Sequence, residues 1–163
     1  MKKLIIAAGI AAAVASFGAS AKDYTSYASV NTVVTGESGF QITATDGANV
    51  DVSGFKAAGV KLGSFSVKAP AGASSFKLSD IHAHDYPQGY VVKIAATAPA
   101  SGTCVATVGS AGVANLAENA TECSITGVGT DAVTLDVTNN ATFDDTVNPG
   151  TKTLTVKFTS TVE

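Results

Sequence analysis

The chain has 163 residues, of which only 14% are charged, and all ten of its basic side chains are lysines. Thirteen acidic residues give a formal net charge of −3 at neutral pH. This acidic balance argues against nucleic acid and anionic membrane surfaces as main partners, because both are bound through basic side chains. A chain of this length can bury about 68–70% of its unfolded surface, which is enough for one core.

The first 21 residues have the pattern of a secretory signal peptide. Lys2 and Lys3 precede an apolar run over residues 4–15, and the small residues Ala19-Ser20-Ala21 follow as a cleavage site. The apolar run is shorter than the roughly 20 residues of a membrane-spanning helix, which argues against the alternative, a retained membrane anchor. We therefore expect residues 1–21 to be removed and the mature chain to be exported.

Residues 22–36 form an N-terminal extension with few charges and with the strand propensity of tyrosine, valine and threonine. Alternation places six of these residues on one face of a strand: Tyr24, Ser26, Ala28, Val30, Thr32 and Val34. Two interpretations are open. The extension pairs inside its own sheet, or it is a donor strand that completes a neighbouring subunit by strand addition.

The body of the chain, residues 37–163, contains short segments in which apolar and polar residues alternate. They lie between glycine, asparagine, aspartate and proline residues, at 40–44, 64–68, 76–79, 133–138 and 154–159. Residues 90–98 are richer in apolar side chains, as expected of a strand covered on both faces. A series of about nine or ten such strands predicts an all-β sandwich or barrel in a single domain.

Both histidines of the chain lie close together. On a strand, His82 and His84 share a face, and with Asp85 they could bind Zn²⁺ or Cu²⁺. Only two or three ligands are visible, however, and Pro87-Gln88-Gly89 marks a loop directly after them. We therefore prefer the interpretation of these three residues as surface residues, and we expect no cofactor.

The chain has two cysteines, Cys104 and Cys123, and each lies in a segment typical of a strand. An oxidising compartment would join them, and such a bridge would stabilise the fold by roughly 3 kcal/mol in the chain-entropy model. A redox or metal site usually has Cys-x-x-Cys spacing or neighbouring histidines, and the chain has neither. We expect a structural disulfide.

Catalytic motifs are absent from the sequence. It contains no Gly-x-Ser-x-Gly, no glycine-rich phosphate loop and no His-Glu-x-x-His, and the expected disulfide leaves no cysteine as a nucleophile. We expect a protein that is not an enzyme.

The end of the chain completes a recognisable combination of features. Asn148-Pro149-Gly150 forms a turn before a terminal strand, TKTLTVKFTSTVE, that ends with the chain. Together with Ala19-Ser20-Ala21, the alternating extension 22–36 and a body rich in Gly, Ala and Thr, this resembles bacterial fimbrial subunits of the chaperone–usher class. The late, closely spaced cysteines and Val162, where many type 1-like pilins have a tyrosine, indicate a divergent member.

The resemblance implies an immunoglobulin-like antiparallel β-sandwich that is incomplete and is finished by donor-strand exchange. The missing strand comes first from a periplasmic chaperone and then from the extension of the next subunit. The acceptor groove would then border the terminal strand, whose apolar face carries Leu154, Val156 and Phe158. Donation from head to tail does not close on itself and therefore builds a filament.

The expected function is that of a structural subunit of a surface fimbria, with an adhesive role as a further option. The implied partners are identical or related subunits, the chaperone, an outer-membrane usher and, for adhesion, a host receptor. The implied route is export through the periplasm to the cell surface. The alternative is an exported monomeric β-sandwich that binds a metal or a carbohydrate.

Overall fold

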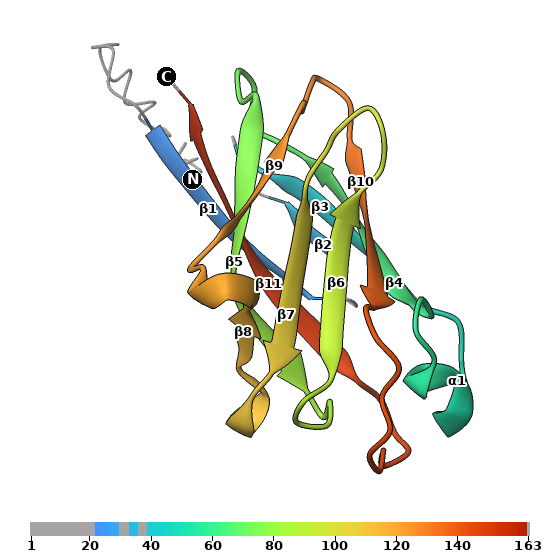
Figure 1. The fold of residues 1–163 in the computed structure, drawn as a ribbon. Helices are drawn as coiled ribbons and strands as arrows, with labels where there is room; N and C mark the ends of the chain where they lie inside the picture. The colour runs from blue at the N-terminus through green and yellow to red at the C-terminus, as the bar shows by residue number, and fades with distance from the viewer. Residues whose placement is uncertain (1–21, 30–32, 36–38, 163) are drawn as a thin grey trace, which may run out of the picture.

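The computed structural model describes residues 22–29, 33–35 and 39–162 (Figure 1). The signal peptide predicted for residues 1–21 lies outside this part of the chain. The strands are β1 (Lys22–Ser29), β2 (Val33–Thr35), β3 (Gln41–Asp46), β4 (Lys61–Lys68), β5 (Ser75–His84), β6 (Val91–Ala96), β7 (Thr103–Val108), β8 (Ala114–Leu116), β9 (Cys123–Thr126), β10 (Val133–Asn139) and β11 (Thr153–Val162). One short α-helix, α1 (Val52–Lys56), and two 3-10 turns, Ser110–Gly112 and Ala117–Asn119, complete the described elements.

The strands form two antiparallel sheets that pack against each other, which confirms the predicted all-β sandwich. One sheet has four strands in the order β1-β11-β5-β9, and the other has seven in the order β2-β3-β4-β10-β6-β7-β8. Every pair of neighbouring strands is antiparallel. The two terminal segments meet in the smaller sheet, where Figure 1 shows the start of β1 beside the end of β11.

The alternating residues of the sequence line the space between the sheets. In β10, Val133, Leu135 and Val137 are buried, and the residues between them are exposed or half-buried. Four phenylalanines from both sheets meet in this core, with Phe158 of β11 at their centre: Phe40, Phe65, Phe76 and Phe158. The ring of Phe158 lies 5.6 Å from that of Phe65 in the opposite sheet, so these aromatic contacts join the two layers.

A second aromatic cluster closes the end of the sandwich that carries α1. Phe55 stacks on Tyr90 with the ring centres 4.6 Å apart, and the Tyr90 hydroxyl donates a hydrogen bond of 2.7 Å to the carbonyl of Phe55. Asn139 is the last residue of β10 and is buried. Its side-chain amide donates to the carbonyls of Lys56 and Ala57, which attaches α1 to the sheet.

The predicted disulfide is present. Cys104 of β7 and Cys123 of β9 are joined, with their Cα atoms 5.6 Å apart. Because β7 belongs to the seven-stranded sheet and β9 to the four-stranded one, the bridge links the two layers of the sandwich.

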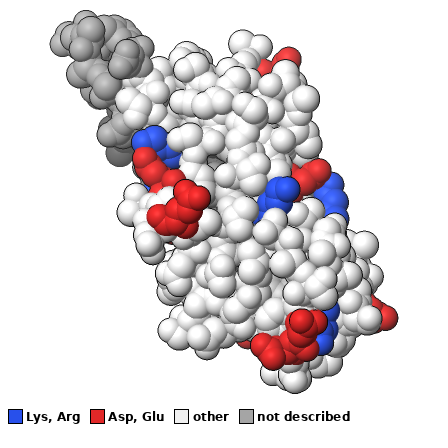
Figure 2. All heavy atoms as spheres, in the orientation of Figure 1, with Lys and Arg blue, Asp and Glu red and all other residues white. Residues whose placement is uncertain are grey.

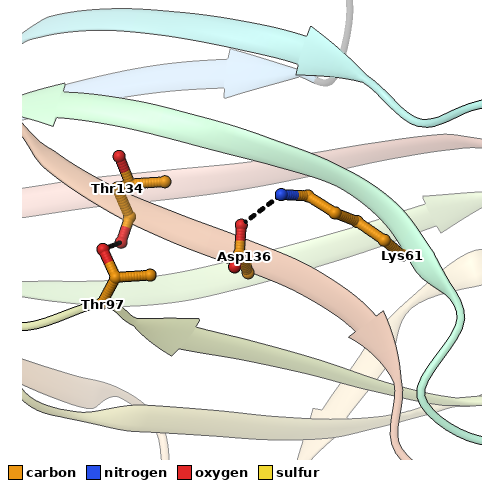
Figure 3. A network of polar contacts seen from close by, with 4 residues as sticks. All are labelled: Lys61, Thr97, Thr134 and Asp136. Carbon is orange, nitrogen blue, oxygen red and sulfur yellow. Dashed lines mark hydrogen bonds and ion pairs between the residues drawn. The ribbon is translucent and has the colours of Figure 1, made fainter.

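The outer surface of the larger sheet is held by modest polar contacts (Figure 3). The Lys61 ammonium of β4 lies 2.7 Å from a carboxylate oxygen of Asp136 in β10, and the Thr97 hydroxyl donates to the carbonyl of Thr134. Such exposed ion pairs contribute about 0–1 kcal/mol. Figure 2 shows that charged side chains are sparse on the face of the molecule that it presents, in keeping with the composition.

Candidate functional site

The terminal strand β11 is the part of the fold on which the expected function depends. Its inner face carries Leu154, Val156 and Phe158, and all three side chains are fully buried. Ser160 continues this row and is also buried, and its hydroxyl donates to the carbonyl of Ser75 at 2.8 Å. This row of side chains therefore faces the core along most of β11.

Strand β11 lies between two antiparallel neighbours. On one side it pairs with β5, and on the other it pairs with β1, the N-terminal strand (Figure 1). The β1 register runs without a break from Lys22 opposite Val162 to Ser29 opposite Thr155. Strand β1 is an edge strand of the smaller sheet, so among the described strands none lies beyond β1 on that side of β11.

The predicted row of the extension is distributed over two sheets. Tyr24, Ser26 and Ala28 lie in β1, opposite Ser160, Phe158 and Val156 of β11, respectively. Val34 lies in β2, opposite Ile42 of β3 in the seven-stranded sheet. Val30 and Thr32 lie outside the described residues.

The extension therefore pairs within its own chain, which is one of the two arrangements considered from the sequence. Strand β1 occupies the edge of β11 that a donated strand would occupy. What the alternation did not reveal is the change of sheet between Ser29 and Val33, because the pattern identifies a face of a strand and not the strand beside it.

A cavity of about 820 Å³ opens at the end of the sandwich where β1 stops. It lies between the last residue of β3, Asp46, the beginning of β4 and the segment that leads into β11, residues 147–152. Figure 1 shows α1 and this segment at the same end of the molecule. Apolar side chains contribute to its lining, among them Val50, Val52, Phe55, Leu62, Tyr86 and Val147.

Burial changes the ionisation of the two tyrosines at this end of the fold. Desolvation raises the pKa of Tyr86 from 10.0 to about 12. The pKa of Tyr90 is also raised, first by burial and second by the neighbouring Tyr86. Both phenols are therefore neutral at physiological pH, and the cavity presents an uncharged aromatic side chain.

The histidine motif lies on the outer face of β5. His82 and His84 are exposed and share a face, as expected from the sequence, and the His84 Nε2 atom lies 3.3 Å from a carboxylate oxygen of Asp85. Within the described part of the chain, no group of three or more His, Cys, Asp or Glu side chains could hold a metal ion. The structure thus brings His84 and Asp85 together, while His82 lies two residues away on the same exposed face of β5.

In the described part of the chain, no helix is long and apolar enough to cross a membrane. Comparison of the chain with protein-family models, with curated proteins and with solved structures found no match.

Proposed function

We propose that this protein is a structural subunit of a surface fimbria that polymerises by inserting its N-terminal extension beside β11 of a neighbouring subunit. The observation that carries the proposal is the position of β1. Strand β11, whose inner row is fully buried, has the N-terminal strand β1 as its neighbour on one edge. In this view the domain is immunoglobulin-like, residues 22–36 are the donor segment, and residues 37–163 are the acceptor.

The physical basis is that the same contacts can form within one chain or between two. Without β1, the backbone groups along one edge of β11 lose their partners, and Val156 and Phe158 no longer have a neighbouring strand on that side. An edge of this kind binds an added strand through the backbone ladder and through alternate side chains. An extension supplied by a second copy restores both, and because each copy both gives and accepts a strand, the assembly is an open filament.

The predicted signal peptide and the disulfide fit an exported protein. Export through the periplasm to the cell surface accounts for both, and the resemblance adds a periplasmic chaperone and an outer-membrane usher as partners. An adhesive role toward a host receptor is compatible with the same assembly.

The first experiment tests the acceptor edge. A chain that lacks residues 22–36 is prepared with and without a synthetic peptide of residues 22–36, and thermal unfolding is followed. We expect a large increase in melting temperature with the peptide. A peptide with Ala28→Asp, opposite buried Val156, should fail to stabilise the shortened chain, whereas the control Thr25→Asp, opposite half-buried Thr159, should still stabilise it.

The second experiment separates a fimbrial subunit from a monomeric domain that needs its own β1. The mature chain is concentrated, warmed and cooled, and its oligomers are separated by native electrophoresis. A fimbrial subunit should give a ladder of linear oligomers, and Ala28→Asp should suppress it. A chain that stays monomeric while the peptide still stabilises the shortened form would contradict the proposal.

The pairing of β1 within its own sheet also favours one alternative. It makes the described sandwich complete without a partner, as an exported monomeric binding module for a metal or a carbohydrate would be. The oligomer ladder decides between these functions, since a monomeric module predicts none.

A further inference from the structure

We propose that the cavity beyond the end of β1 receives residues 30–34 of a second copy, so that the strand exchanged between copies is longer than β1. This inference rests on the proposed function and specifies the partner surface of the same site. It assigns a role to the cavity at the α1 end of the fold, to which no role has been given so far.

The register of β1 on β11 leads directly to the cavity. Each step along β1 moves one residue back along β11, and Ser29 is opposite Thr155. If an inserted strand continues in the same register, its residue 30 falls opposite Leu154 and its residue 32 opposite Lys152. Leu154 is fully buried, and Lys152 and the residues just before it line the cavity. Residue 34 of the inserted strand, two positions further on, therefore reaches the cavity itself.

The chain's own extension cannot make this contact in the observed arrangement. Val33, Val34 and Thr35 form β2 and pair with Thr43, Ile42 and Gln41 in the opposite sheet. Only three residues separate Ser29 from Val33, so the chain must leave the edge of β11 soon after β1 ends. The extension of a second copy has no such constraint, because its later residues need not pair with this copy's β3.

The apolar part of the cavity matches that segment, and Asp46, Asp51, Lys61 and Lys152 supply the charged part of the lining. Residues 30–34 read VNTVV and carry no charge. Val50 and Val52, which line the cavity, are 44% and 39% exposed and are two of the three exposed large apolar residues in the described chain. Tyr86, whose phenol stays neutral, and Leu62 add apolar surface. A volume of about 820 Å³ lies within the range of about 300–1,000 Å³ that is typical of binding pockets.

The longer contact also supplies a reason for exchange. Replacing β1 by the same eight residues of another copy changes little in the ladder itself. Residues 30–34 of the second copy add buried apolar surface in the cavity. The loss is small, because the pairing given up is that of β2, a strand of three residues at the edge of its sheet. The structure therefore points to an assembly that favours insertion between copies over insertion within one chain.

The test uses the mature full chain and fluorescent peptides of residues 22–36, incubated until the bound fraction no longer changes and analysed by size-exclusion chromatography. Val33 and Val34 offer a matched pair, because they are identical residues on opposite faces of an inserted strand. We expect the peptide with Val34→Asp to bind about tenfold more weakly than the natural peptide. The peptide with Val33→Asp should bind within about twofold of the natural one.

A second matched pair lies in the protein. Val50→Asp in the cavity should weaken the natural peptide by a similar factor, about tenfold. Val113→Asp, at a residue that is 46% exposed and does not line the cavity, should leave binding unchanged. Equal binding of the Val33→Asp and Val34→Asp peptides, or no effect of Val50→Asp, would overturn the inference while leaving the proposed function intact. Failure of every peptide to bind the full chain would also overturn it, and the shortened chain then shows separately whether the acceptor edge exists.

Discussion

Both edges of β11 carry an antiparallel neighbour, but the two neighbouring strands are attached differently to the rest of the fold. The β5 partner is part of the interior of the chain and is followed by β9, which the Cys104–Cys123 disulfide ties to the opposite sheet. The β1 partner is the first described strand and lies at the edge of the sheet. How firmly a strand is held beside β11 therefore depends on its attachments elsewhere in the fold as well as on the antiparallel ladder itself.

Irregularity also distinguishes the two edges. The pairing of β11 with β5 shifts between Thr155 and Lys157, and Asp80 of β5 has a φ of 44° at this point. Such a bulge specifies one register, since sliding β5 along β11 would displace it. The pairing of β11 with β1 runs through eight positions without a shift. The regular ladder accepts a second copy of the same strand more readily than the bulged one.

The largest expected effect comes from Phe158, whose side chain lies on the buried face of β11, the strand between β1 and β5. Phe158→Ala removes a fully buried ring that contacts three other phenylalanines, and we expect the free energy of unfolding to fall by about 3–5 kcal/mol. Denaturant titration measures the loss. The variant should also bind the 22–36 peptide more weakly, because Ser26 pairs opposite this position. A loss below about 1 kcal/mol would show that the core is not organised around this ring.

Removing the disulfide should lower the stability of the fold without weakening the binding of a strand at the β1 edge of β11. The double variant Cys104→Ala/Cys123→Ala removes the covalent bond between two residues that are 19 positions apart in the sequence. We expect it to lower the free energy of unfolding by about 3 kcal/mol. Where the variant remains folded, its affinity for the 22–36 peptide, measured by fluorescence titration, should stay within about twofold of the unsubstituted protein. A large loss of peptide binding would show that the two edges are coupled.

The smallest effect concerns the cavity at the end of the β1 edge and depends on pH. Folding raises the Tyr86 pKa to about 12, so the unfolded chain releases this proton near pH 10 while the folded chain keeps it. The Tyr86 contribution to stability is therefore complete below pH 10 and is lost between about pH 10 and 12. The loss should reach at most about 1.4 kcal/mol per pH unit.

Denaturant titrations at several alkaline pH values measure this slope. Tyr86→Phe should flatten it in part, because the Tyr90 pKa is raised as well and Tyr90 remains. Identical slopes for the two proteins would show that Tyr86 is not buried in the way described.

Much of the sandwich could be predicted because each strand carries its own pattern. In β11, the alternation of Leu154, Val156 and Phe158 with polar residues identified the buried face correctly. The shared face of His82 and His84 was also correct. The bulge at Asp80, which keeps Ile81 inward after Leu78, was not visible, because its cause lies in pairing with a distant strand. The helix α1 was missed for a related reason, since five residues show no helical period and Asp51 caps them only through local geometry.

Which residues face the core and which two cysteines can pair could be predicted from the amino-acid sequence, because these depend on residue type and on a period of two. The division of the extension between two sheets, with β1 beside β11 and β2 beside β3, is visible only in the folded chain. The cavity where β1 ends is likewise visible only there. Alternation carries no information about which strand lies alongside, because pairing between strands far apart in the chain is settled by the packing of the whole core.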